Sequence, residues 1–178
     1  MFNTLLALGT VALQLFIVAV VLSVIVKSSF ASWVAKNATV ILRVVFVGAA
    51  LGSLIYQYHF SYPPCILCWY QRLAIFSIAI LLFTSSFAKS ALLRSQVLIL
   101  GFFGLAVAIF HNIIDIFQIS NLGTCGAVGP SCLARYVHTF GYITIPMMSF
   151  TVLLAGVVVA LLIKRYPQQN VAGLENRV

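Results

Sequence analysis

Residues 4–26 read TLLALGTVALQLFIVAVVLSVIV and contain no charged side chain. An α-helix rises about 1.5 Å per residue, so about 20 apolar residues cross the roughly 30 Å hydrocarbon core of a bilayer. This stretch is long enough and apolar enough to be a transmembrane helix. Similar stretches follow at about residues 40–58, 67–87, 96–118 and 139–163. The sequence therefore predicts an all-α integral membrane protein: a four-helix transmembrane bundle with an extra N-terminal transmembrane helix.

The composition supports this class. Hydrophobic residues make up 63% of the chain, charged residues only 7%, and the mean hydropathy is +1.15. The net charge of +8 arises from ten basic and two acidic residues, a balance that in a soluble protein would suggest a nucleic-acid partner. In a membrane protein the same excess is typical of basic loops on one side of the bilayer. We therefore expect contact with membrane lipid and no nucleic-acid partner.

The polar breaks between the apolar stretches are too short to hold a second domain. We expect an N-terminal anchor and cytoplasmic loop over residues 1–39, a four-helix domain over 40–163 and a cytoplasmic tail over 164–178. The first apolar stretch is followed, rather than preceded, by lysines. A secretory signal peptide has the opposite order, so this stretch is expected to be a retained anchor.

The orientation follows from the basic residues, because cytoplasmic loops retain lysine and arginine. One set of breaks and the tail carry Lys27, Lys36, Lys89, Arg94, Lys164, Arg165 and Arg177. The opposite side holds the segment from His59 to Cys68 and the segment from Ile119 to His138. All four cysteines are therefore expected to face the extracytoplasmic side.

The cysteines form two pairs in the sequence, Cys65 with Cys68 and Cys125 with Cys132. An oxidising compartment permits disulfides, so both pairs could be structural. A C-x-x-C bridge closes almost no chain and so stabilises little, and this spacing favours redox cycling instead. A zinc site built from thiolates is the alternative chemistry for the same residues.

The first pair is expected at the start of a helix. Pro63 and Pro64 hold the preceding chain extended, so a helix can begin only at about Cys65. Free amides and the positive end of the helix dipole favour thiolate in that first turn. Cys65, Cys68 and Arg72 share one helix face. A guanidinium one turn deeper in the membrane is costly and usually marks a site, the alternative being that Arg72 snorkels to the interface.

A second polar group lies near the outer end of the fourth apolar stretch. His111 and Asp115 are spaced i, i+4 on a helix, with Asn112 beside them. The depth expected for His111 is close to that of Arg72, so it is a candidate to line a ligand pocket. The alternative is that His111 only hydrogen-bonds Asp115 in a structural pair.

The stretch from Pro64 to Arg72, PCILCWYQR, resembles the C-x-x-C-x-x-x-R signature of the DsbB family, including its BdbC branch. GYITIP at residues 141–146 resembles the opening of the last helix in that branch. The similarity covers about residues 40–163. It implies a quinone reductase of the bacterial inner membrane that reoxidises a thioredoxin-fold disulfide donor of the DsbA/BdbD type.

The resemblance also implies roles for the candidate residues. The reduced donor would attack the Cys125–Cys132 disulfide at Cys125, and the reduced pair would then exchange with Cys65–Cys68. The Cys68 thiolate would pass two electrons to ubiquinone or menaquinone. Arg72 would stabilise the thiolate and the developing quinone anion, and His111 would line the quinone pocket.

Two features depart from the family pattern. The helix over about residues 4–26 is additional to the four-helix bundle. The Cys125–Cys132 spacing is short, as in the BdbC branch and unlike DsbB proper, which leaves the order of attack on these sulfurs open. Gly126, Gly129 and Pro130 can turn the chain tightly enough for a disulfide.

Two other functions fit parts of the pattern. A relative of vitamin K epoxide reductase would also couple outer cysteines, a C-x-x-C pair and a quinone, although the position of Arg72 four residues after Cys68 argues against it. A non-enzymatic four-cysteine metal binder or transporter would use the thiolates as ligands instead.

Overall fold

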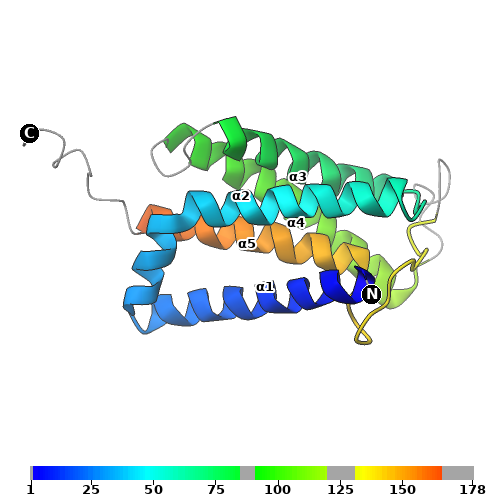
Figure 1. Ribbon diagram of the computed structural model, residues 1–178, viewed down its shortest axis with the longest axis horizontal. Coiled ribbons are helices and arrows are strands. Elements are labelled where there is room, and N and C mark those ends of the chain that lie inside the picture. Colours follow the sequence, from blue (N-terminus) through cyan, green and yellow to red (C-terminus); the bar gives the residue numbers. More distant parts are fainter. Residues whose placement is uncertain (1, 85–90, 120–130, 166–178) are drawn as a thin grey trace, which may run out of the picture.

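The computed structural model describes residues 2–84, 91–119 and 131–165, and these residues form α-helices joined by short irregular segments. The helices are α1 (Phe2–Ile25), α2 (Ser29–Tyr58), α3 (Ile66–Thr84), α4 (Ala91–Phe117) and α5 (Ile145–Arg165). All five are long and apolar enough to cross a membrane. They lie side by side along one axis (Figure 1). The predicted all-α membrane fold is therefore confirmed.

Three helix boundaries differ from the sequence prediction by five residues or more, and one of them is the start of α4, which is Ala91 instead of about residue 96. The expected break up to Thr39 is helical from Ser29, and the first turns of α2 run across the end of the bundle before the helix turns along it (Figure 1). The last helix begins at Ile145 instead of about residue 139. Positive φ angles at Phe140 and Gly141 form a tight turn, which pairs Thr139 with Ile143 and delays the helix.

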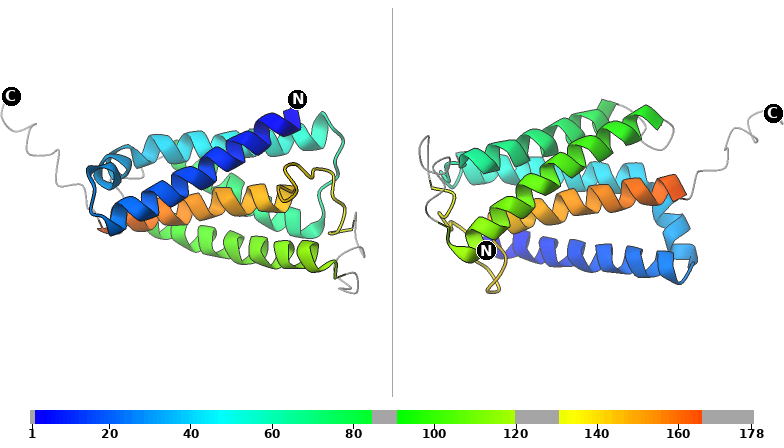
Figure 2. Two further views of the ribbon diagram at one scale, coloured as in Figure 1. Left: turned by 90° about the horizontal axis from the view of Figure 1, so that it is seen from below. Right: turned by 180° about the vertical axis from the view of Figure 1, so that it is seen from behind.

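Helix α1 packs on the bundle as a fifth member. It lies against α5 and α2 along its length, and Figure 2 shows it crossing in front of them in one view. Gln14 donates to the hydroxyl of Thr151 on α5 at 3.2 Å and accepts from the Tyr142 hydroxyl at 3.0 Å. The sequence predicted an N-terminal transmembrane anchor here, and the structure adds that this helix packs against α5 and α2.

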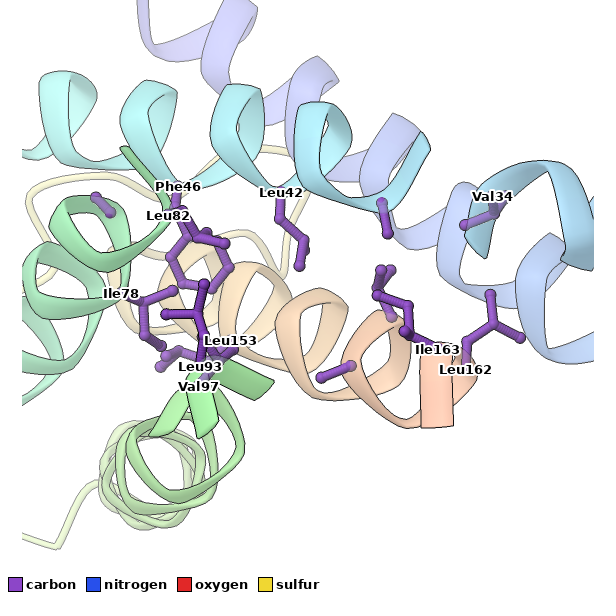
Figure 3. Packing of buried hydrophobic residues seen from close by; sticks show 14 of the residues in the cluster. Val34, Leu42, Phe46, Ile78, Leu82, Leu93, Val97, Leu153, Leu162 and Ile163 are labelled. Carbon is purple, nitrogen blue, oxygen red and sulfur yellow. The ribbon is translucent and has the colours of Figure 1, made fainter. Parts of the chain in front are cut away.

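The core lies where α2, α3, α4 and α5 meet, and it is built from interlocking aliphatic side chains around Phe46 (Figure 3). Glycines allow the helices to approach closely. A Cβ atom at Gly156 would lie 2.7 Å from the Phe46 ring, and one at Gly104 would lie 2.8 Å from the Cβ of Ala74. Without a hydrophobic driving force between helices in lipid, such close packing holds the bundle together.

The two ends of the bundle differ in character. Lys27 follows α1, Arg94 lies in the first turn of α4 and Arg165 ends α5, so these basic residues lie at one end. The opposite end holds the start of α3 with its cysteines and the segment 131–144 (Figure 1). The helices thereby place the whole C-x-x-C region at the less basic end.

The close approach at Gly104 generates a stability prediction. Gly104→Ala should lower the thermal stability of the protein in detergent by about 1–3 kcal/mol, because the added methyl group would overlap Ala74 and Leu153. Gly48→Ala is the matched control, since a Cβ there meets no atom within 4 Å. Its stability should be unchanged or slightly raised by the better helix propensity of alanine. Equal melting temperatures for the two variants would contradict the packing described at Gly104.

Candidate active site

Cys65 occupies the cap position of helix α3, as the two preceding prolines predicted. The helix begins at Ile66, and the backbone N–H of Cys68 donates to the Cys65 sulfur at 3.3 Å. The Trp69 N–H donates to the Cys65 carbonyl at 3.1 Å. A cysteine sulfur thus takes the place of the oxygen that usually caps a helix. Negative charge on this sulfur is favoured by the amide and by the helix dipole.

The two sulfurs of the C-x-x-C pair are free and lie 2.8 Å apart. Cys65 is only 5% exposed. The hydrogen bond from the Cys68 thiol, followed by the contact with His111, lowers the pKa of the Cys65 thiol to about 4, against the opposing effect of burial. Cys65 is therefore the sulfur of the pair whose environment favours the thiolate form.

His111 connects the two cysteine regions. Its Nε2 lies 3.8 Å from the Cys65 sulfur and 3.2 Å from the carbonyl oxygen of Cys132, and its Nδ1 lies 3.0 Å from the side-chain nitrogen of Gln71. A carbonyl can only accept, so Nε2 carries the proton, and Nδ1 then accepts from Gln71. The ring, 1% exposed, is fixed with its N–H directed at the redox centre.

Asp115 does not pair with His111, so that alternative is wrong. Arg135 donates from Nε to the Asp115 carboxylate at 2.6 Å and from Nη2 to the Asp115 carbonyl at 2.6 Å. The next residue, Tyr136, stacks on Tyr62 with ring centroids 4.9 Å apart. These contacts tie the segment that follows Cys132 to α4 and to the segment that precedes Cys65.

Cys132 is disulfide-bonded and buried, and it packs in one cluster with Cys65 and Ile114. The structure thus brings a cysteine of the second pair against the first pair, as a relay between pairs requires. Cys125, its expected partner, lies outside the described residues, as do Gly126, Gly129 and Pro130.

Arg72 is buried and directed into the bundle, which does not fit snorkelling to the interface. It is 9% exposed, donates to the side-chain oxygen of Gln57 and donates to the Ser53 carbonyl at 2.7 Å. Its guanidinium also lies 5.7 Å from the centre of the Trp69 ring. Both hydrogen-bond acceptors are neutral, and Asp115, the one acidic side chain among the described residues, pairs with Arg135 instead. The positive charge of Arg72 is therefore held in place without being neutralised there.

A cavity of about 560 Å³ joins these residues. Cys65, Cys68, Arg72, His111 and Cys132 all line it, together with apolar side chains of α1, α2 and α5. Its size and its mixture of many apolar walls and few polar groups are typical of sites for small organic ligands.

Three further polar side chains belong to this site and were not identified from the sequence. Gln57 holds Arg72, Gln71 holds His111, and Tyr56 lines the cavity with a buried hydroxyl that has no hydrogen-bond partner among the described residues. Gln57 and Gln71 could have been identified from the sequence, because an amide side chain inside an otherwise apolar span needs a hydrogen-bond partner. Tyr56 could not be identified from the sequence, because it resembles the aromatic residues that are common at membrane interfaces.

One group of side chains in the described part of the chain could hold a metal ion. The ligand atoms of Cys65, Cys68 and His111 lie within 4.8 Å of one another. This narrows the metal alternative from four thiolates to two thiolates and one imidazole, because Cys132 is disulfide-bonded.

Comparisons with known proteins agree with this geometry. The family model for disulfide bond formation protein DsbB matches residues 35–164. A probable disulfide formation protein C 2 of Bacillus anthracis is 32% identical over 126 residues, which cover 71% of this chain and 89% of that protein. The SPbeta prophage-derived disulfide bond formation protein B of Bacillus subtilis is 34% identical over 116 residues, covering 64% and 78%. A probable disulfide formation protein of Chlamydia pneumoniae is 32% identical over 116 residues, covering 65% and 83%.

No solved structure matches the chain. The family match spans α2 to α5 and includes both cysteine regions, whereas α1 precedes it. With a C-x-x-C pair at a membrane-helix start and a second cysteine packed against it, this chain belongs to the DsbB family of disulfide bond formation proteins, which are membrane disulfide oxidoreductases.

Proposed function

We propose that the protein oxidises a thioredoxin-fold disulfide donor of the DsbA/BdbD type and transfers the electrons to a membrane quinone. The observation that carries this proposal is the shared cavity, in which the C-x-x-C sulfurs lie with a buried arginine that is not neutralised by a described carboxylate. The unpartnered Tyr56 hydroxyl and the apolar walls suit a ring with carbonyl oxygens and an apolar body. The residues present therefore fit a quinone.

The first step takes place at the second cysteine pair. A thiolate of the reduced donor attacks the Cys125–Cys132 disulfide, and by resemblance it attacks Cys125. The second donor thiol then displaces Cys125 from the mixed disulfide. The donor leaves oxidised, and both Cys125 and Cys132 are left as thiols. Because Cys132 packs against Cys65, little movement is needed for the next exchange.

The second step passes the electrons inward. A Cys132 or Cys125 thiolate attacks the Cys65–Cys68 disulfide, and the exchange leaves the second pair oxidised and the inner pair reduced. The described state, with free Cys65 and Cys68 and a disulfide-bonded Cys132, matches the end of this step. The Nε2–H of His111 faces the Cys65 sulfur and stabilises its charge as the disulfide opens.

In the last step the inner pair returns to the disulfide and gives up two electrons and two protons. Cys68 and Arg72 would hold the ring of a quinone, which would supply the two-electron oxidation when bound. Cys68, which lies one turn above Arg72 on α3, is the sulfur proposed to face the acceptor. Arg72 stabilises negative charge on this sulfur and on the ligand oxygen. Its bonds to Gln57 and Ser53 fix the guanidinium before the reaction begins.

The proposed function also implies how the protein is oriented in the membrane. Disulfide formation belongs to an oxidising compartment, so the end with the cysteines faces the extracytoplasmic side of a bacterial cytoplasmic membrane. The basic residues at the other end, Lys27 and Arg94 among them, then face the cytoplasm as the positive-inside rule requires.

Reconstitution tests the function directly. Purified protein in liposomes with ubiquinone or menaquinone should oxidise a reduced thioredoxin-fold donor catalytically, whereas without quinone each protein should oxidise at most two donors, one for each of its disulfides. Cys68→Ala should still form the mixed disulfide with the donor and fail to turn over. Sustained turnover without quinone, or in Cys68→Ala, would contradict the proposal. Resistance of the thiols to alkylation until a chelator is added would instead indicate the metal site.

Arg72 variants test the acceptor site. Arg72→Ala should accumulate normally in the membrane, yet its apparent affinity for quinone should fall by about tenfold or more, since a desolvated charge–ligand interaction contributes about 1.5–3 kcal/mol. Arg72→Lys should lie between wild type and Ala because lysine supplies charge without the planar fork. The measurement is donor oxidation at several quinone concentrations. If the rate of Arg72→Ala depends on quinone concentration as in wild type, Arg72 does not take part in quinone binding.

The acidic Cys65 thiol generates a pH prediction. Since its pKa is lowered to about 4, the thiolate should persist as the pH falls through the usual thiol range and be lost only near pH 4. His111→Ala should move this midpoint upward. The rate of alkylation by iodoacetamide as a function of pH, in reduced Cys125→Ser/Cys132→Ser protein, measures it. A midpoint close to an ordinary thiol value of about 8.5 would contradict the arrangement around Cys65.

A further inference from the structure

Three side chains of metal-binding type meet at the inner redox centre. The sulfurs of Cys65 and Cys68 lie 2.8 Å apart, and the Nε2 atom of His111 lies 3.8 Å from the Cys65 sulfur. All three atoms lie within 4.8 Å of one another. Two thiolates and one imidazole form the ligand set of zinc sites that keep their fourth position open. The redox centre therefore contains the donor atoms of such a site.

The spacing of these atoms is close to the spacing that a zinc ion requires. Tetrahedral zinc has bonds of about 2.3 Å to sulfur and about 2.0 Å to nitrogen, so its ligand atoms lie about 3.5–3.8 Å apart. The distance from the Cys65 sulfur to Nε2 of His111 already meets this value. The two sulfurs would have to separate by about 1 Å. Cys68 lines the cavity, so its side chain can turn toward open space.

Gln71 can support His111 as a metal ligand. In the described state Nε2 carries the proton and donates to the Cys132 carbonyl at 3.2 Å, while Nδ1 accepts from Gln71 at 3.0 Å. A metal ion needs the lone pair of Nε2, so the proton would move to Nδ1. The Gln71 amide has an oxygen beside its nitrogen, and after a half-turn it accepts from Nδ1. A hydrogen bond of this kind to the second ring nitrogen accompanies most histidine ligands.

The charges around the site restrict which state of the protein can bind a cation. The three ligand residues line the same cavity as Arg72, whose positive charge opposes the entry of a metal ion. Two ionised sulfurs offset the charge of a divalent ion, so binding requires that Cys65 and Cys68 are both thiolates. Thiolates also select zinc over magnesium and calcium, which prefer oxygen ligands.

We propose that the reduced C-x-x-C pair and His111 form a zinc site that exists only in the reduced protein, and that bound zinc inhibits the enzyme by holding this pair reduced. The inhibitory role rests on the proposed quinone reaction. Zn²⁺ replaces the thiol protons, up to two of them, and no electron moves. The oxidised pair has no thiolate to offer, so zinc stabilises the reduced pair over the disulfide by mass action.

An inhibitory ion differs from the ion of a metal-binding protein in its effect on the fold. Contacts away from the site hold this bundle together, including the core around Phe46 and the ion pair of Arg135 with Asp115. Removal of zinc should therefore leave the protein folded, and the zinc-free protein is the active form.

The first experiment measures binding. Full-length Cys125→Ser/Cys132→Ser protein, which keeps only the inner pair, is stripped with a chelator, reduced with a phosphine and titrated with ZnCl₂ against a chromophoric chelator. Reduced protein should bind about one ion, and protein oxidised with diamide should bind at least about 100-fold more weakly. Co²⁺ in place of zinc should give the visible absorption of tetrahedral cobalt–thiolate only in the reduced protein. Equal binding in both redox states, or no binding in either, would overturn the proposal.

Variants in the same background identify the third ligand. His111→Ala should weaken zinc binding by about 100-fold, and Gln71→Ala, which removes only the supporting hydrogen bond, by about tenfold. The matched control is His59→Ala/His138→Ala, which removes the two other histidines of the chain, both exposed. This control should bind zinc as tightly as its parent. Normal affinity in His111→Ala, or loss of affinity in the control, would show that His111 is not the ligand. A normal cobalt spectrum of Gln71→Ala at saturation shows that this variant still folds.

The last experiment measures inhibition. The reduced Cys125→Ser/Cys132→Ser protein is mixed with quinone alone, so that no donor thiol competes for zinc. The rate at which the inner thiols disappear should fall about tenfold when about nine tenths of the protein has zinc bound, and EDTA should restore it. An unchanged rate at that occupancy would overturn the inhibitory role. If the quinone reaction itself is wrong, the thiols persist even without zinc, whereas zinc binding is still measured.

Discussion

Inside a bilayer a backbone N–H or C=O has no water to bond, and this constraint governs where the chain of this protein can leave the helical conformation. The described non-helical segments on the cysteine side, residues 59–65 and 131–144, lie at one end of the bundle. There the helix start of α3 leaves amides free, and the Cys65 sulfur satisfies one of them. The Cys65 sulfur thus accepts a hydrogen bond from the free backbone N–H of Cys68 and is also the reactive atom.

Two arginines near the cysteines are held in different ways. Arg135 is neutralised by Asp115, and this pair secures the segment that carries Cys132. Arg72 is bound by a neutral amide and a carbonyl, which orient it without cancelling its charge. An ion pair with one exposed partner contributes little net stability and mainly fixes geometry, whereas a buried cation with neutral partners is costly unless an anion forms beside it. One arginine therefore fixes the position of a segment, and the other keeps its positive charge beside the C-x-x-C pair.

Much of the fold could be predicted from the sequence because membrane helices are specified by length and hydropathy alone. The start of α3 was also readable, since Pro63 and Pro64 leave few conformations for the residues before Cys65. The beginning of α2 could not be predicted from the sequence. Lys36 and Asn37 resemble loop residues, but a helix of about 45 Å exceeds the hydrocarbon core, so its first turns lie beyond it and tolerate polar side chains.

The site was predictable along each helix and much less so between helices. Spacing placed Cys68 and Arg72 on one face, and both line the cavity. The same rule suggested His111 with Asp115, and it failed because each side chain bonds to a partner from another segment, His111 to Gln71 of α3 and Asp115 to Arg135. Rotation of a helix about its axis depends on packing across the whole bundle. The role of α1 as a cavity wall was hidden for the same reason.

The attachment of α1 has a consequence for how the protein is made. Gln14 and its partner Thr151 are separated by 137 residues, so the helix that is synthesised first is secured by the one that is synthesised last. Until α5 enters the membrane, α1 and α2 can form a hairpin but lack the helix that contacts both of them. The cavity is consequently completed only when the final span arrives, because α5 supplies part of its lining. A nascent chain paused before that point would already contain its C-x-x-C pair but not the complete cavity around it.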